Sequence, residues 1–186
     1  MLELGASYVL GVDVAESELA EARMHAIPGR LEFRRHDLHD PLEGHFDLIF
    51  GRAILHHIDY PAVLERVYDE NLMPGGTLAF MEPLGTNLIT RLFHRLVRSA
   101  HTPDERPLRR DELRWFAARF PGFELIPINY VSYPAGILSS LIFPRPENAM
   151  TRLADTVDRR LEQRFPRLHP NFRQGILMVR KPRRAA

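Results

Sequence analysis

The chain has 186 residues, of which 45% are hydrophobic and 26% are charged, and 25 basic against 24 acidic residues give a formal net charge of +1. The balanced charge argues against a protein that coats nucleic acid, because such domains carry a strong basic excess. The absence of cysteine excludes disulfides, thiolate zinc ligands and thiol nucleophiles. No apolar run reaches the roughly 20 residues of a transmembrane helix, and the N-terminus lacks a basic signal segment, so we expect a cytoplasmic protein.

The first half of the chain alternates strand-like and helix-like segments. Apolar runs with few charges predict strands at residues 8–13, 31–34, 46–50 and 77–81. Helical patterns occupy residues 15–25 and 61–72, and a turn is predicted at 73–76. This order predicts βαβ units, and therefore an α/β fold with a mainly parallel sheet covered by helices on both faces.

The second half is richer in helix. Apolar periodicity predicts helices at residues 88–100, 111–120 and 147–165, and a loop is expected at 102–107. Further strands are predicted at residues 123–131 and 175–179. An apolar segment at residues 136–143 lies between two prolines, and a basic tail follows at 180–184.

Two carboxylates stand where ligands bind in open α/β sheets, at the carboxyl ends of strands. Asp13 ends the first predicted strand and Asp37 follows the second. The first can accept hydrogen bonds from the vicinal hydroxyls of a ribose, and the second from the exocyclic amine of an adenine. The simpler interpretations are that Asp13 caps the following helix and that Asp37 is a turn residue. The two together favour an adenosine site.

A histidine pair follows the third predicted strand. His56, His57 and Asp59 suggest a metal site, but adjacent residues do not share a helix face and no third ligand has zinc-like spacing. We therefore expect no metal. Either one histidine is buried and the other exposed, or one of them faces a substrate pocket as a polar or proton-accepting group.

These residues resemble the class I S-adenosylmethionine-dependent methyltransferases, in the small-molecule branch, over about residues 5–82. The strings that carry the resemblance are Gly11-Val12-Asp13, His36-Asp37-Leu38, Phe46-Asp47-Leu48-Ile49, Leu55-His56-His57-Ile58 and Leu72-Met73-Pro74-Gly75-Gly76-Thr77-Leu78. In the family the first resembles the strand end that holds the ribose, and the second the turn that contacts adenine. The last is similar to its "LxPGG" turn. The implied fold is Rossmann-like.

The resemblance also implies a site and a reaction. The residues it implies for binding S-adenosyl-L-methionine are Asp13, Val14, Asp37, Leu38, Gly51 and Arg52. Its candidates for acid–base catalysis are His57, His56 and Glu82. The implied activity is methyl transfer to a small-molecule or lipid-like acceptor, with no nucleic acid as partner. Two other classes stay open: a non-catalytic remnant that acts as a binding module, and a nicotinamide-dependent oxidoreductase, whose ribose Asp13 would also suit.

The same resemblance gives an organisation for the whole chain. We expect a single methyltransferase-like domain at 1–186, with a cofactor-binding half at 1–82 and a substrate-side half at 83–186. The second half carries a helical insertion at about 134–168. Its apolar segment, residues 133–143, would pack on the sheet, line an acceptor pocket, or make weak contact with a membrane surface near the basic tail.

One part of the family pattern is missing. Only Met1 to Ser7 precedes the strand that ends at Asp13, whereas a parallel crossover needs about a dozen residues. We therefore expect Leu2 to Gly5 to end a helix, with Gly5 as its C-cap, and the family's first strand and glycine-rich loop to be absent by truncation. The neighbouring strands must then pair directly, leave an open slot with unpaired amides, or accept a strand from elsewhere. We expect weak cofactor binding as a result.

Overall fold

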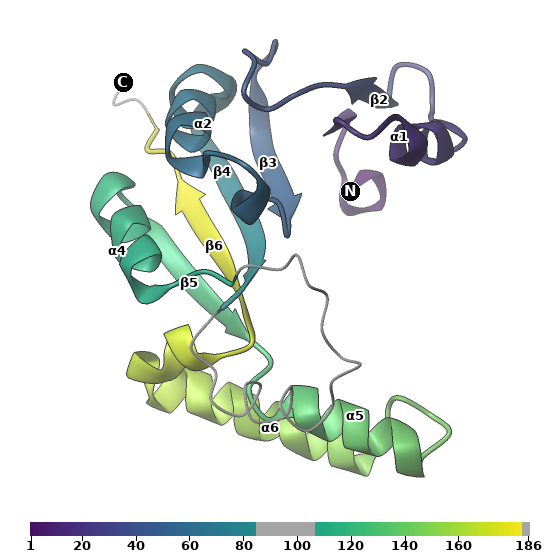
Figure 1. Cartoon of the computed structure of the whole chain (residues 1–186), viewed down its shortest axis with the longest axis vertical. Coiled ribbons are helices and arrows are strands. Elements are labelled where there is room, and N and C mark those ends of the chain that lie inside the picture. The colour runs from purple at the N-terminus through teal and green to yellow at the C-terminus, as the bar shows by residue number, and fades with distance from the viewer. Residues whose placement is uncertain (85–106, 184–186) are drawn as a thin grey trace. The chain divides into compact units, whose positions relative to one another are not determined.

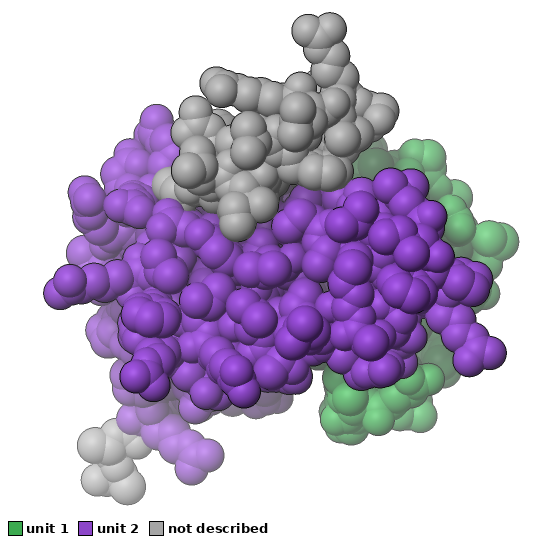
Figure 2. Space-filling view, turned by 90° about the horizontal axis from the view of Figure 1, so that it is seen from below, with its two compact units in different colours: residues 1–44 green, residues 45–186 purple. Residues whose placement is uncertain are grey.

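The computed structural model describes residues 1–84 and 107–183. They form two compact units, Met1–Gly44 and His45–Ala186, which Figure 2 colours separately. The predicted helix at 88–100 and the loop at 102–106 lie outside the described residues. The α/β class is confirmed, while the single domain at 1–186 stays a prediction.

Unit 1 is one parallel βαβ motif (Figure 1). Its elements are the 3-10 helix η1 (Leu2–Leu4), β1 (Val9–Asp13), α1 (Glu16–Arg23) and β2 (Leu31–Arg35). Val9 pairs with Leu31 and Asp13 with Arg35. Gly5 ends η1 with a φ of 95°, and its N–H donates to the carbonyl of Leu2, as the sequence predicted for a glycine C-cap.

Unit 1 has almost no core of its own. Leu19 of α1 is its one buried hydrophobic side chain. Gly11 allows the Phe33 ring to lie directly over β1, because a Cβ at Gly11 would be 2.6 Å from that ring. A unit of this size without cysteine or a larger core is marginal by itself.

Unit 2 contains a four-stranded mixed sheet with strand order β3-β4-β6-β5. Its strands are β3 (Phe46–Arg52), β4 (Leu72–Pro83), β5 (Phe123–Ile128) and β6 (Gln174–Arg180). Its helices are η2 (Leu55–His57), α2 (Tyr60–Arg66), η3 (Val67–Asn71), α4 (Arg110–Arg119), α5 (Ser132–Ile142), α6 (Ala149–Arg164) and η5 (Pro166–Asn171). β3 and β4 are parallel, whereas β6 is antiparallel to both β4 and β5.

The predicted turn at 73–76 lies inside β4 as an irregularity. Phe46 pairs with Leu72, but Leu48 pairs with Thr77, so β4 carries extra residues opposite β3. Gly75 accommodates this irregularity with a φ of 86°. The glycine-rich string is therefore a bulge within a long strand and does not precede the strand.

The core of unit 2 lies where α2 and α4 meet. Tyr60 stacks on Phe116 with ring centroids 5.7 Å apart, and Phe116 and Phe120 are both fully buried. Lys181 then caps the helix that continues α2, since its Nζ donates to the carbonyls of Tyr68 and Leu72 at 2.5 and 2.9 Å.

The predicted apolar segment forms α5, which pairs with α6 as a helical hairpin (Figure 1). Burial along α5 is the opposite of the usual pattern, in which apolar side chains are buried and polar ones exposed. Ser139 is the one buried residue of α5, while Leu141 is 79% exposed. The basic tail does not accompany this hairpin. Gln174 pairs with Ile128, which leads into α5, whereas Arg180 lies at the other end of β6. The expected proximity of tail and apolar segment is therefore wrong.

Each unit has a strand at the edge of its own sheet. Among the described residues, β1 pairs with β2 in unit 1, and β3 pairs with β4 at one edge of the four-stranded sheet of unit 2. The outcomes that the sequence left open for these two strands stay predictions. On β3, Leu48 and Phe50 are 42% and 57% exposed, which is unusual for an apolar strand of a parallel sheet. Unpaired backbone groups and exposed apolar side chains thus coincide on β3.

Candidate functional site

In unit 1 the candidate site begins at the carboxyl ends of two adjacent parallel strands. Asp13 is opposite Arg35 in the ladder, and the N–H of His36 extends it by donating to the carbonyl of Asp13 at 2.9 Å. Asp37 is the next residue. The structure thus places Asp13 and Asp37 at neighbouring strand ends, as the sequence predicted from the βαβ spacing.

Each of these two carboxylates uses one oxygen to hold its own turn. Asp13 Oδ1 accepts from the N–H of Ala15 at 2.8 Å, just before α1. Asp37 Oδ1 accepts from the N–H of His39 at 2.9 Å and lies 2.8 Å from the ring nitrogen Nδ1 of His39. Both aspartates are exposed. Each second oxygen, Oδ2, makes no hydrogen bond to any residue in the described ranges and is open to a ligand.

Hydrogen bonding keeps Asp37 ionised. The backbone N–H of His39 is the largest cause, with the His39 ring second, and together they lower the pKa of Asp37 below its usual value. A carboxylate in this state is acceptor-only, so it suits a ligand that presents N–H or O–H donors. The turn interpretation and the ligand interpretation of Asp37 are therefore compatible.

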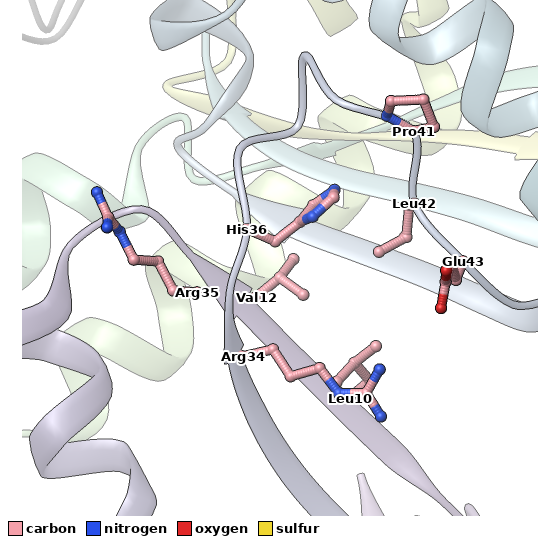
Figure 3. A pocket seen from close by; sticks show the side chains of 8 residues that line it. All are labelled: Leu10, Val12, Arg34, Arg35, His36, Pro41, Leu42 and Glu43. Carbon is pink, nitrogen blue, oxygen red and sulfur yellow. The ribbon is translucent and has the colours of Figure 1, made fainter.

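A pocket of about 240 Å³ lies on one face of the β1–β2 pair (Figure 3). Its lining residues are Leu10, Val12, Arg34, Arg35, His36, Pro41, Leu42 and Glu43. His36, from the end of β2, and Leu42, from the following loop, project into the same space (Figure 3). His36 Nε2 is buried and has no hydrogen-bond partner, so this pocket, which apolar and charged side chains line together, has an unsatisfied polar atom beside it.

The remaining unit 1 candidates flank the two aspartates. Val14 is 56% exposed, and its carbonyl accepts from Arg35 Nε at 3.3 Å. Leu38 is half-buried. The sequence interpretation named His36 only as part of the His36-Asp37-Leu38 string, with no role of its own, and did not name Leu42. The alternation of residues along β2 could have identified His36. Leu10 pairs with Glu32 and Val12 with Arg34, so His36, two residues further on, lies on the same face of the sheet as Arg34.

In unit 2 the candidates gather at the carboxyl ends of β3 and β4. Gly51 pairs with Phe80 and Arg52 with Met81. A Cβ at Gly51 would be 2.7 Å from the Phe80 ring and 2.8 Å from Ile54, so only glycine fits without movement. Ala53 follows with a φ of 50°, an uncommon value for a residue with a Cβ, and its N–H donates to the carbonyl of Met81 at 2.9 Å. No sequence signal identified this strained position.

Glu82 and the two histidines form a connected cluster. Glu82 is fully buried, and its Oε1 accepts from the N–H groups of Ile54 and Leu55 at 2.8 and 3.0 Å. Its Oε2 lies 3.2 Å from His56 Nδ1. The side chain of His56 is 2% exposed, and its ring centroid lies 4.0 Å from that of His57, which is exposed. The structure therefore brings all three predicted acid–base residues together, and it gives them different access to solvent.

Metal sites and membrane-spanning helices are two other features that a chain of this kind could carry. Within residues 1–84 and 107–183, no three histidine or acidic side chains converge in a way that could hold a metal ion. Across the same part of the chain, no helix is both long and apolar enough to cross a membrane.

Comparison with known proteins gives a consistent result. Residues 1–80 match the family model described as a methyltransferase domain. The chain is 40% identical over 76 residues to a trans-aconitate 2-methyltransferase of Deinococcus radiodurans, covering 40% of this chain and 28% of that protein. It is 33% identical over 85 residues to a ubiquinone biosynthesis O-methyltransferase of Nitrosococcus oceani, covering 43% and 36%. The chain thus spans about a third of the length of these curated relatives.

Solved structures share the fold over more of the chain. An S-adenosylmethionine-dependent methyltransferase from Mesorhizobium loti matches with a TM-score of 0.53 and 22% identity, covering 97% of this chain and 83% of that one. A putative methyltransferase in complex with the Haloferax volcanii Trm112 activator matches with a TM-score of 0.56 and 18% identity, covering 97% and 74%. These likenesses show a Rossmann-like α/β fold, which this chain shares with the two solved proteins.

Proposed function

We propose that this chain is a class I S-adenosylmethionine-dependent methyltransferase, which binds S-adenosyl-L-methionine and serves methyl transfer to a small-molecule acceptor; the match of residues 1–80 to the methyltransferase family model supports the proposal. The observation that carries the proposal is the pair of exposed carboxylates, Asp13 and Asp37, at adjacent ends of parallel strands, each with one oxygen open to a ligand. The sulfonium of the bound cofactor supplies an activated methyl group. The chain's own residues have to bind, orient and exclude water.

The unit 1 residues fit the adenosine part of this cofactor. Asp13 Oδ2 is free to accept from ribose hydroxyls, and the ionised Asp37 is free to accept from the adenine amine. Val14 and Leu38 supply apolar surface beside these two carboxylates for the faces of the base. Asp13 would also suit the ribose of a nicotinamide cofactor, but the matching family is that of methyltransferases.

The unit 2 residues are assigned by the family pattern. Gly51 and Arg52 end β3, where Gly51 leaves room for the side chains of Phe80 and Ile54 and Arg52 is exposed. His57, His56 and Glu82 are the group available to hold a proton when the acceptor is a hydroxyl or an amine.

The open sheet edges support a second part of the proposal, namely weak cofactor binding by this polypeptide by itself. Among the described residues β1 pairs on one side, with β2, and β3 pairs on one side, with β4, and Leu19 is the one buried hydrophobic side chain of unit 1. Ordering such a unit around a ligand costs conformational entropy, which lowers the net affinity. The same observation favours an alternative function, a non-catalytic binding module whose open edges accept another polypeptide.

The acceptor is proposed to be a small or lipid-like molecule. One curated relative is named a trans-aconitate 2-methyltransferase and the other a ubiquinone biosynthesis O-methyltransferase. The exposed apolar side chains at the end of α5, Leu138, Leu141, Ile142 and Phe143, support a weak contact with a membrane surface or a lipid-like acceptor. The cytoplasmic location predicted from the sequence stays a prediction.

Titration with S-adenosylhomocysteine, followed by amide NMR shifts, tests the proposal. We expect shifts at β1 and β2 that saturate with a Kd of about 0.1–1 mM, and Asp13→Asn or Asp37→Asn should weaken binding about tenfold, or 1.4 kcal/mol. The control is Glu21→Gln, an exposed carboxylate on α1 of the same unit. Absence of shifts at millimolar ligand would refute cofactor binding and leave the binding module. Low-micromolar affinity would refute only the weak-binding part.

A further inference from the structure

Glu82 stands at an unexpected position for a carboxylate. Along β4, alternate residues face the core, namely Gly76, Leu78, Phe80 and finally Glu82, which is 0% exposed. A charge with no access to water is costly unless several donors compensate it. Its environment therefore has to be specific.

Three consecutive residues supply that compensation. The N–H groups of Ile54 and Leu55 both donate to Oε1 of Glu82, and Nδ1 of His56 lies 3.2 Å from Oε2. Leu55 and His56 belong to η2 and Ile54 is its N-cap, all more than 25 residues earlier in the sequence than Glu82. One carboxylate from β4 thus fixes the chain that leaves β3.

This contact also sets the tautomer of the His56 ring. An ionised carboxylate can only accept hydrogen bonds, so Nδ1 of His56 has to carry the hydrogen. In the neutral ring, Nε2 then holds the lone pair. The buried ring of His56 in turn lies against the exposed ring of His57.

We propose that Glu82 and His56 are positioning residues for the methyl transfer proposed above, and that neither touches the acceptor. Glu82 holds η2 and locks His56 as the Nδ1–H tautomer, and His56 supports the ring of His57. Of the three, His57 alone is exposed, so it is the one an acceptor can reach. This assignment rests on the proposed function, whereas its geometry is testable without cofactor.

Glu82→Gln separates the two effects of the carboxylate. The glutamine carbonyl can still accept from Ile54 and Leu55, but its NH2 group then faces His56 and donates to Nδ1. We expect His56 to be the Nδ1–H tautomer in the unmodified chain and the Nε2–H tautomer in Glu82→Gln. The measurement is imidazole nitrogen NMR on the neutral rings, with assignments from His56→Gln and His57→Gln. The control Glu124→Gln, an exposed carboxylate on β5, should leave His56 unchanged.

A second experiment uses the unmodified chain and therefore does not depend on whether Glu82→Gln folds. Diethyl pyrocarbonate should modify the exposed His57 readily. It should modify the buried His56 at least about tenfold more slowly, because that reaction requires local opening of the structure around the ring. Mass spectrometry of the peptide that contains both residues measures the two rates. The proposal is overturned if His56 is the Nε2–H tautomer in the unmodified chain, or if the two rings react equally fast. Failure of cofactor binding would leave both readouts intact and would count against the proposed function alone.

Discussion

Asp158 of α6 is the group that starts α5, and its removal tests how the helical hairpin is held. Its carboxylate accepts from the N–H groups of Tyr130, Val131 and Ser132 at 2.8, 2.7 and 3.1 Å, and from the Ser132 hydroxyl at 2.6 Å. Asp158 is only 8% exposed. α5 has no side-chain cap from its own N-cap residue, Val131, so this carboxylate replaces one.

The expected loss of stability follows from the hydrogen-bond donors that Asp158→Ala would leave without an acceptor. Three backbone N–H groups lose their acceptor, and an unsatisfied buried donor costs about 1–3 kcal/mol. Tyr130, Val131 and Ser132 are half-buried, so water satisfies part of the demand. We expect a loss of about 3 kcal/mol for Asp158→Ala, and about 1.5 kcal/mol for Asp158→Asn, which keeps one acceptor.

Urea unfolding measures these losses. Far-UV circular dichroism follows α5 and α6, and the fluorescence of Trp115, the single tryptophan of the chain, reports on α4 in the same unit. The control is Asp155→Ala, which removes an exposed carboxylate one turn earlier on α6 and should change stability by less than about 0.5 kcal/mol. If Asp158→Ala cost less than about 1 kcal/mol, or no more than the control, the carboxylate would not be what holds α5.

Three further predictions concern the sheets and the strand ends. Gly51→Ala should lower the free energy of unfolding by about 1–3 kcal/mol, because the new Cβ would overlap the Phe80 ring, and urea unfolding measures it; an unchanged midpoint would contradict the close packing. His39→Ala should raise the pKa of Asp37 only part of the way to its usual value, because the larger cause, the backbone N–H, remains. Because the folded-state pKa of Asp37 is depressed, its hydrogen-bonded carboxylate stabilises the fold at pH values above the unfolded-state pKa. That stabilisation is lost as the pH falls through the folded-state pKa, and NMR titration of the carboxyl group measures the folded-state pKa in both chains. Phe50→Lys should reduce self-association measured by light scattering, because it places a charge on the open, apolar edge strand β3; equal scattering would argue that this edge is not adhesive.

The amino-acid sequence was sufficient for the local structure and for one half of the candidate site. Apolar runs and turn residues predicted the strands, and the glycine at position 5 predicted the C-cap, because these depend on neighbours within a few residues. Asp13 and Asp37 were also within reach, since a right-handed βαβ crossover brings successive parallel strand ends to one edge.

Only the tertiary structure decided which groups are buried and which edges are open. The sequence offered one buried and one exposed histidine as an interpretation but could not say which is which, because that depends on how β4 faces η2. The division into two sheets, the bulge in β4 and the exposed apolar side of α5 likewise depend on pairing between distant segments. Such features cannot be predicted locally, because the residues of one strand or helix do not determine which distant segment packs against it.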